Sequence, residues 1–207
     1  MNLTLGPSDD EAFVDALLDG MKTACEELSP EGFQVSAGGG DISSTHGQTV
    51  ISVTVLGEAS PAGPVLRNGA VPGDRLIVLG LPGAAAAGLD LLSGDIDADA
   101  ADYPALVEAH RRPRPATRKG ALLGLYGVPS ALIDISDGLA QDLGHILEAS
   151  SVGATLETHN LPRHPELVSL AEAVDVDVLD YILTGGDDYE LLLSVPPGRM
   201  PKLWELA

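Results

Sequence analysis

The chain has 207 residues and a formal net charge of −20, from 31 acidic and 11 basic side chains, and 44% of it is hydrophobic. That hydrophobic content supports a buried core and excludes a disordered chain, and with 3% aromatic residues the core must consist of Ala, Val, Leu and Ile. A nucleic-acid surface needs a basic stripe, which is not visible, and an anionic membrane would repel the chain. A polyphosphate ligand would also be repelled unless metal ions bridge it.

Cysteine content and the terminal sequence limit the class further. Cys25 is the only cysteine, so an internal disulfide and a Cys-based zinc site are both excluded. The stretch from Met1 to Glu11 lacks the basic and apolar segments of a signal peptide, and no apolar run approaches the roughly 18 residues of a membrane-spanning helix. We therefore expect a cytoplasmic protein.

The first part of the chain predicts one helix and two strands. Ser8 and Glu11 fit a capping box, and apolar residues then recur at helical spacing up to Leu28. Residues 34–37 form a short strand candidate, and 50–57 is a second one, rich in β-branched residues. The stretch 59–64, Ala-Ser-Pro-Ala-Gly-Pro, has the composition of a linker and predicts a domain boundary.

Beyond this linker, strands and helices are mixed, without repeats. The strand candidates are 75–79, 131–135, 152–157 and 189–195. The helix candidates are an Ala-rich stretch ending near Ser93, then 103–110, a segment ending near Leu125, 139–148 and 165–173. This mixture predicts the α/β or α+β class.

Three acidic segments indicate the chemistry, each with carboxylates beside glycine at the edge of an apolar run. They are Gly38–Asp41, Ile133–Leu139 and Thr184–Leu191. Crowded carboxylates repel unless a proton or cation neutralises them, and Mg²⁺ binds through one or two carboxylates together with substrate phosphates. The pattern predicts a metal–nucleotide site.

The second acidic segment is predicted to be a strand-to-helix turn. Asp134 lies in the apolar strand, Ser136 and Asp137 can cap the following helix, and Gly138 lets a ligand approach the backbone. A helix N-terminus adds free N–H groups for a phosphate. The alternative is that Asp137 is only an N-cap and Asp134 only a solvent-facing strand residue.

The other two acidic segments have structural alternatives as well. Gly38–Asp41 alone is better explained as a hairpin turn, although three consecutive glycines exceed what a turn needs. Residues 185–190 could be a turn before a buried strand, with the doubled Asp187-Asp188 as the anomaly.

Basic residues and histidines add little by themselves. Arg111, Arg112 and Arg114 form the only basic cluster, which a helix C-terminus explains better than phosphate binding does. The five histidines show no ligand spacing, and Asp142 and His145 share a helix face in a pattern more often found at a surface than in a metal site. The chain has neither a P-loop nor a Gly-x-Ser-x-Gly motif.

Taken in order, these motifs resemble thiamine-monophosphate kinase, a family of the AIR synthetase-like (PurM-like) superfamily. The matching segments cover most of the chain: Gly-Gly-Asp at 39–41, Arg-x-Gly-Ala at 67–70, His-Arg-Arg-Pro-Arg-Pro at 110–115, Ile-Asp-Ile-Ser-Asp-Gly-Leu-Ala-Gln-Asp-Leu at 133–143 and Gly-Gly-Asp-Asp-Tyr-Glu-Leu at 185–191. The last two are the specific ones.

The resemblance implies transfer of the ATP γ-phosphoryl group to thiamine monophosphate, giving thiamine diphosphate. It implies catalytic carboxylates at Asp41, Asp134 and Asp137 that hold Mg²⁺. It also implies ATP contacts from Gly40, Asp41, Arg67 and Ser136, and a homodimer that binds neither nucleic acid nor membrane. Asp187 stands near the substrate, where the family usually has Glu.

The resemblance also implies that the chain is incomplete at both ends. An N-terminal Gly-Asp-Asp-Ala-Ala motif with further Mg²⁺ ligands, and a C-terminal part with an aromatic residue near the substrate, have no counterpart here. We therefore expect a two-lobed PurM-like kinase fold, with a partial N-terminal ATP/Mg-binding lobe (1–58), a linker (59–64) and most of a C-terminal α/β lobe (65–207).

Two other functions remain open. One is a non-catalytic nucleotide-binding or structural fragment of the same fold, for which the missing N-terminal aspartates are the discriminating feature. The other is a different ATP-dependent member of the superfamily, such as a selenophosphate synthetase or a hydrogenase-maturation enzyme. A selenophosphate synthetase normally carries a reactive Cys or selenocysteine near its start, which this chain lacks.

Overall fold

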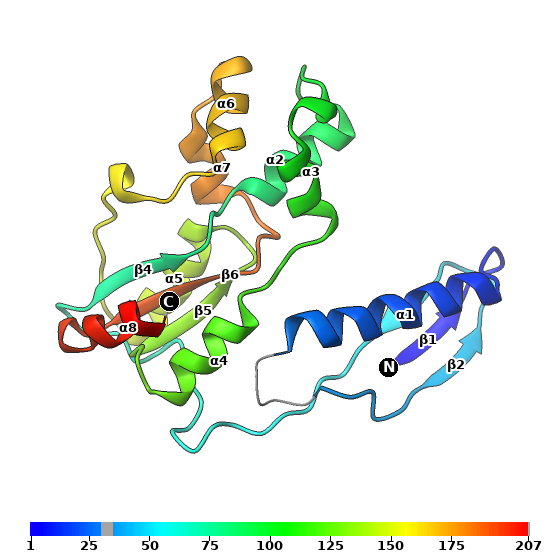
Figure 1. The fold of residues 1–207 in the computed structure, drawn as a ribbon, viewed down its shortest axis with the longest axis horizontal. Helices are drawn as coiled ribbons and strands as arrows, with labels where there is room; N and C mark the ends of the chain where they lie inside the picture. The colour runs from blue at the N-terminus through cyan, green and yellow to red at the C-terminus, as the bar shows by residue number, and fades with distance from the viewer. Residues whose placement is uncertain (30–34, 207) are drawn as a thin grey trace. The chain divides into compact units, whose positions relative to one another are not determined.

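The computed structural model describes residues 1–29 and 35–206 (Figure 1). Its contacts divide the chain into two compact units, Met1–Ala59 and Ser60–Ala207. Each unit contains a three-stranded sheet of its own. Within the described ranges, no helix is long and apolar enough to cross a membrane.

The first unit is a small sheet with one long helix. Strand β1 (Asn2–Leu5) lies in the middle of the order β2-β1-β3, parallel to β2 (Asp41–Ser44) and antiparallel to β3 (Val50–Ser52). Helix α1 (Glu11–Leu28) confirms the predicted helix. Its cap differs from the prediction, because the Asp10 carboxylate accepts a hydrogen bond from the Phe13 amide at 2.9 Å, which makes Asp10 rather than Ser8 the N-cap.

The strand predictions in this unit are only partly confirmed. Gln34 lies outside the described residues, and 35–37 form no strand. The predicted strand at 50–57 is much shorter, because β3 pairs only with the few residues of β1, from Thr4 opposite Val50 to Asn2 opposite Ser52. Asp41 begins a strand parallel to β1, so the glycine run before it is not a hairpin turn.

The second unit is built on an antiparallel sheet in the order β4-β6-β5, formed by β4 (Arg75–Leu79), β5 (Ala131–Ile135) and β6 (Glu190–Val195). All three strands were predicted from their apolar runs. The predicted strand at 152–157 is not present. This stretch is irregular, and Val152 and Leu156 pack against the core without a strand partner.

Helices cover both faces of this sheet (Figure 1). On one face, Leu191, Leu193 and Val195 of β6 pack with α4 (Thr117–Leu125) and α8 (Met200–Leu206). On the other, Leu192 packs with α5 (Leu139–Ser150) in a larger core. That core also contains α2 (Ala84–Ser93), α3 (Pro104–Arg111), α6 (Pro165–Ala173) and α7 (Val178–Thr184). Short 3₁₀ turns lie at Ala100–Asp102, Thr158–Asn160 and Pro197–Arg199.

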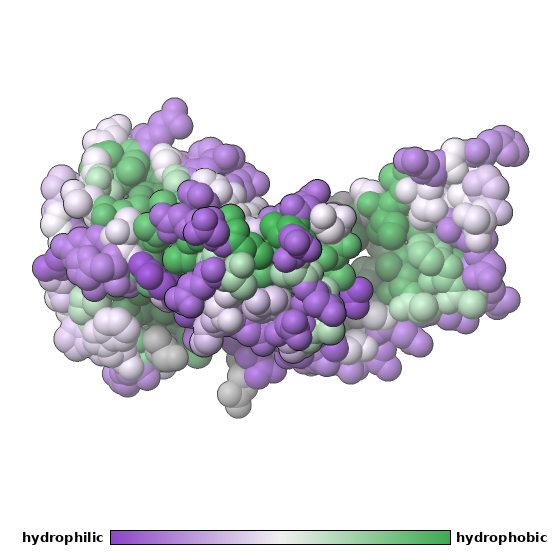
Figure 2. All heavy atoms as spheres, turned by 90° about the horizontal axis from the view of Figure 1, so that it is seen from above, coloured by the Kyte–Doolittle hydropathy of each residue, from purple (hydrophilic) through white to green (hydrophobic). Residues whose placement is uncertain are grey.

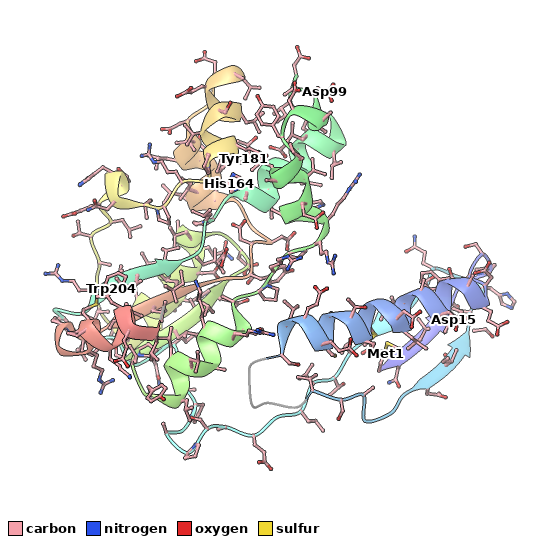
Figure 3. The ribbon with its side chains drawn as sticks, in the orientation of Figure 1. Met1, Asp15, Asp99, His164, Tyr181 and Trp204 are labelled. Atoms are coloured by element: carbon pink, nitrogen blue, oxygen red, sulfur yellow. The ribbon has the colours of Figure 1, made fainter. Side chains whose placement is uncertain are left out.

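The alternation along β6 therefore places consecutive side chains in two different cores. Each fully buried leucine contributes on the order of 1.5–3 kcal/mol, so the central strand is held firmly from both sides. A polar link joins two helices of the larger core: the Tyr181 hydroxyl, labelled on α7 in Figure 3, donates to Asp90 of α2 at 2.7 Å. Burial, together with that bond to Asp90, raises the pKa of Tyr181.

Candidate functional site

The turn between β5 and α5 places two acidic side chains at the end of the sheet. Asp134 lies opposite Leu191 in the β5–β6 pairing, and Asp137 follows in the turn; both side chains are exposed. The N-cap of α5 is Gly138, and no side chain caps it at that position. Neither Ser136 nor Asp137 is therefore the N-cap, and the carboxylate of Asp137 instead accepts from the side-chain amide of Gln141 at 3.3 Å.

The turn is held from inside by Asp142, in the first turn of α5. Its side chain is 2% exposed, and one carboxylate oxygen accepts hydrogen bonds from the amides of Ser136 at 3.0 Å and Asp137 at 3.1 Å. Hydrogen bonds to an ionised group are roughly twice as strong as neutral ones. Asp142 thus fixes the backbone from which Ser136 and Asp137 project.

The third acidic segment lies directly against this turn. The amide of Asp187 donates to the Ser136 carbonyl at 2.9 Å, and the amide of Tyr189 donates to the Ile135 carbonyl at 2.8 Å. Asp187 and Tyr189 both have left-handed backbone, with φ of 64° and 54°. Such conformations cost on the order of 1–3 kcal/mol and are concentrated at functional sites.

Two glycines allow the segments to approach so closely. A Cβ on Gly186 would lie 2.6 Å from the Ser136 carbonyl oxygen. Gly138 has φ of 104°, and a Cβ there would lie 2.9 Å from the Thr184 carbonyl group. The side of Gly138 that a Cβ would occupy therefore faces the backbone of Thr184.

Asp188, beside Asp187, has a separate structural role. It is 8% exposed, and its two oxygens accept from the amides of Gly83 at 2.6 Å and Ala85 at 3.0 Å, at the start of α2. Burial raises the pKa of Asp188, although these backbone hydrogen bonds oppose the rise. The doubled aspartate is thus explained: Asp188 anchors a distant helix, and Asp187 stays at the surface.

The side chain of Tyr189 lies near several of these carboxylates. Its hydroxyl donates to the Asp187 carboxylate at 3.1 Å. This hydrogen bond is the main cause that raises the pKa of Tyr189, and the charges of Asp187, Asp134 and Asp137 add to it. Carboxylates from both acidic segments therefore act on one phenol.

A pocket of about 660 Å³ opens along the β5 edge and the following turn. Its lining is Val65, Leu66, Arg67, Leu132, Ile133, Asp134, Ser136, Asp137, Asp142, His145 and Leu191. Four residues singled out from the sequence, Arg67, Asp134, Ser136 and Asp137, are thus brought together, with one guanidinium facing the same space as two carboxylates.

The Arg67 loop is tied to both neighbours. The Leu132 amide donates to the Leu66 carbonyl at 3.3 Å, which adds the loop to the free edge of β5. The Ser150 hydroxyl, at the end of α5, donates to the Arg67 carbonyl at 3.2 Å and accepts from the Ala70 amide at 3.2 Å. Helix α5 therefore holds the Ser136–Asp137 turn at one end and the Arg67 loop at the other.

Gly40 and Asp41 belong to the first unit. The Asp41 side chain is exposed, and its amide donates to the Met1 carbonyl at 3.1 Å. A Cβ on Gly40 would lie 2.2 Å from the same carbonyl oxygen, so Gly40 is needed for strand pairing, whereas Gly38 and Gly39 face open space.

The donor atoms at the turn fit a hard cation. Asp134 and Asp137 offer exposed carboxylates and Ser136 a hydroxyl, and Mg²⁺ prefers oxygen ligands of this kind. Donor atoms of Asp137, Asp142 and His145 also lie within 4.8 Å of one another. That second set suits Mg²⁺ less, because one Asp142 oxygen already accepts two amides and His145 offers nitrogen.

A second, smaller pocket of about 240 Å³ lies between α2, α3 and the start of β6. Arg112 and Arg114 line it with Glu108, Asp188 and Glu190. Arg111 lies in the last turn of α3 and Arg112 is its C-cap, so the helix-end explanation holds for these two, while Arg114 lies beyond the helix.

Residues 71–201 match the family described as AIR synthase related protein, C-terminal domain. The chain belongs to the AIR synthase related family. The matched segment contains β4, the Ser136–Asp137 turn and the whole of the third acidic segment, whereas Gly40, Asp41 and Arg67 lie outside it.

Curated relatives match this chain over most of its length. A thiamine-monophosphate kinase of Salmonella typhimurium is 36% identical, over 94% of this chain and 56% of the relative. One of Mycobacterium tuberculosis is 37% identical, over 93% of this chain and 55% of the relative. The chain therefore spans about half the length of the curated relatives it matches.

Solved structures agree on the fold. The structure of AaThiL complexed with AMPPCP and TMP has a TM-score of 0.78 and 28% identity, and covers 96% of this chain and 61% of its own. Thiamine-monophosphate kinase from Stenotrophomonas maltophilia K279a has a TM-score of 0.75, with 28% identity, over all of this chain and 64% of its own. Hydrogenase maturation protein HypE, at 19% identity and a TM-score of 0.66, shares the fold alone.

Sequence reasoning missed one buried residue that holds the candidate site. Asp142 was interpreted as part of a surface pair with His145, which is wrong because Asp142 is buried. The signal was present: Leu139, Leu143 and Ile146 form the buried face of α5, and position 142 lies on the same face. A carboxylate on a core-facing stripe requires partners, and the turn before it supplies them.

Proposed function

We propose that the chain is part of a thiamine-monophosphate kinase, which transfers the γ-phosphoryl group of ATP to thiamine monophosphate and forms thiamine diphosphate. The observation that carries the proposal is the pocket where Arg67, Asp134, Ser136 and Asp137 meet. The names of the relatives support the same reaction. We place the reaction in the cytoplasm, where ATP is available.

Each residue has a role in this proposal. Asp134 and Asp137 of the second unit are assigned to Mg²⁺, and Asp41 of the first unit is likewise assigned to Mg²⁺; these three are the proposed catalytic carboxylates. Gly40, Asp41, Arg67 and Ser136 contact ATP, consistent with the AMPPCP in the related AaThiL complex. The backbone amide of Asp187 donates to the Ser136 carbonyl, so Asp187 lies beside the turn. In this proposal the Asp187 carboxylate faces the thiamine monophosphate.

Phosphoryl transfer makes particular demands on these side chains. The transferred group carries charge on its equatorial oxygens, so a protein contributes mainly positioning and charge neutralisation. Bound Mg²⁺ neutralises phosphate charge and orients the reacting oxygens. Arg67 can pair with two phosphate oxygens at once, and the Ser136 hydroxyl can donate to a third. The acidic surface repels any phosphate that arrives without its cation.

Asp187 differs in length from the Glu expected at this position. Its left-handed backbone and its hydrogen bond from Tyr189 restrict where the shorter carboxylate can reach. A hydrogen bond from the substrate to the Asp187 carboxylate therefore requires the substrate to lie close to the Ser136–Asp137 turn.

The first unit supports a homodimer. Among its described residues only Leu3 and Gly6 are buried, and no side chain of α1 is. Ile42 and Ile51 pair with Leu3 from the two neighbouring strands and so share its face, yet they are 55% and 45% exposed. Figure 2 shows apolar surface on this unit between hydrophilic patches. A sheet this small needs further cover, which a second copy would supply.

Calorimetric titration with Mg·AMPPCP tests the nucleotide site. Wild type should bind, and both Asp134→Asn and Asp137→Asn should weaken binding about tenfold or more, while AMPPCP with a chelator should bind weakly to all three proteins. Asp97→Asn, which changes an exposed carboxylate on the loop after α2, is the matched control and should bind like wild type. Equal affinity in all variants would contradict the proposed metal site.

Formation of thiamine diphosphate tests the reaction itself. Because the chain spans about half of its relatives, we expect it to bind nucleotide but to transfer little phosphate alone. Binding without transfer, even in a chain extended to the length of the relatives, would favour the non-catalytic alternative.

A further inference from the structure

We propose that Asp142 is a positioning residue for the nucleotide pocket: its buried carboxylate fixes the Ser136–Asp137 turn and takes up the backbone amides of Ser136 and Asp137, so that these two amides are not free to bind a phosphate. This inference rests on the proposed function, because it concerns the same pocket. It adds a residue that touches neither nucleotide nor metal, and it changes how phosphate can enter the site.

Asp142 occupies two backbone amides of the turn. A phosphate bound at a helix N-terminus is usually held by the free backbone N–H groups there. The N–H groups of Ser136 and Asp137, in the turn just before the N-cap Gly138, both point instead at one oxygen of Asp142, at 3.0 and 3.1 Å. The side chain of Asp142 is buried, so a phosphate cannot displace it without leaving a carboxylate unpaired in the core.

The negative charge of Asp142 also affects how a phosphate can bind. Asp142 lies in the first turn of α5, where the helix dipole favours a negative charge. It also adds negative charge next to Asp134 and Asp137, so a phosphate meets repulsion here unless a cation accompanies it.

Asp142 also determines which groups of Ser136 and Asp137 face the pocket. With their amides turned toward Asp142, Ser136 and Asp137 present only their side chains to the pocket, where both residues are lining. Ser136 therefore recognises nucleotide through its hydroxyl, and Asp137 through a bound cation. If Asp142 is removed, the turn can rotate and the Asp137 carboxylate loses its fixed place.

The test compares Asp142 with a matched carboxylate elsewhere. Glu166 of α6 accepts from the amides of Ala105 at 2.9 Å and Leu106 at 3.3 Å, so it also binds two consecutive backbone amides, but it lies outside the pocket. The variants are Asp142→Asn, Asp142→Ala and Glu166→Gln. Thermal unfolding and calorimetric titration with Mg·AMPPCP are measured for each, using the 207-residue chain.

All three variants should lower the unfolding temperature. Only the Asp142 variants should weaken Mg·AMPPCP binding, by about tenfold or more for Ala and less for Asn, which keeps one acceptor oxygen. The Asp142→Asn protein, the milder change, keeps the test valid if Asp142→Ala fails to fold. Mg·AMPPCP affinity equal to wild type in a folded Asp142 variant would overturn the role of Asp142 alone. Failure of wild type to bind Mg·AMPPCP would overturn the proposed function, and this inference with it.

Discussion

The backbone amide of Asp187 donates a hydrogen bond to the carbonyl of Ser136 at 2.9 Å, and this contact joins two acidic segments that are about fifty residues apart in the sequence. Because the donor and acceptor are backbone groups, the spacing of the two segments does not depend on side-chain rotamers. Ser136 and Asp187 therefore keep a fixed separation, which suits the proposed kinase site, where nucleotide and substrate would be held in one geometry.

Gly186 makes this contact possible, and its replacement should destabilise the protein. A Cβ in Gly186→Ala would lie 2.6 Å from the Ser136 carbonyl oxygen, so the two segments must separate, at a cost of about 1–3 kcal/mol. Gly144→Ala, on α5 with open space around it, is the control and should be neutral or slightly stabilising. Chemical denaturation measures both, and equal free energies of unfolding for wild type and Gly186→Ala would contradict the prediction.

The sequence predicted individual elements well where an apolar run, a cap or a glycine marked them. Strand β5 and helix α6 have the expected bounds, since each combines a periodic apolar pattern with a clear start. The pairing of strands in the first unit was not predictable from the sequence. Strand β3 is short because its partner β1 is short, and β1 itself carried no strand signal that we recognised.

The site was predicted as a set of residues rather than as a geometry. Acid-rich turns beside glycine indicated the Asp134–Asp137 turn, because crowded charge is visible in a sequence. The sequence did not show that Asp187 lies at the surface while Asp188 is buried. This difference depends on the start of α2, which lies beside Asp188 although it is more than a hundred residues away in the chain. Long-range hydrogen bonds of this kind leave no local pattern.

Asp188 should therefore matter for stability rather than for chemistry. In Asp188→Ala the amides of Gly83 and Ala85 lose their acceptor, at a cost of about 1–3 kcal/mol, which exceeds the relief from removing a buried charge. Asp177→Ala, which removes an exposed N-cap of α7, is the comparison and should cost about 1 kcal/mol. Denaturant unfolding that ranks Asp177→Ala as the more damaging change would argue against this role.

If the face of the first unit's sheet that carries Leu3 and Ile51 forms the dimer contact, a charge placed on that face should disrupt the dimer. Ile51→Lys places an ammonium among apolar side chains and should shift the protein from dimer to monomer in light scattering. Ser52→Lys, the next residue, projects from the opposite face and should remain dimeric. Circular dichroism checks that both variants are folded, and a monodisperse wild-type monomer at high concentration would count against the dimer.

The pH dependence of stability should reveal Glu190, which is half-buried beside Asp188. Burial is the main cause that raises the pKa of Glu190, and the charge of Asp188 adds to it, while the Leu81 amide and Lys119 oppose the rise. A carboxyl group whose pKa is higher in the folded state binds its proton more tightly there. Its contribution to stability is therefore complete at acid pH, below the pKa of the unfolded chain, and is lost as pH rises through the folded pKa.

Glu190→Gln removes this titration, so the variant should unfold at a higher temperature than wild type at pH 8, and the difference should shrink as pH falls toward 4. Lys119→Ala removes an opposing charge, so the pKa of Glu190 should rise further and the loss of stability at neutral pH should be larger than in wild type. Thermal unfolding of the three proteins between pH 4 and pH 8 measures both effects. Parallel curves for wild type and Glu190→Gln would show that the Glu190 carboxylate carries no burial cost.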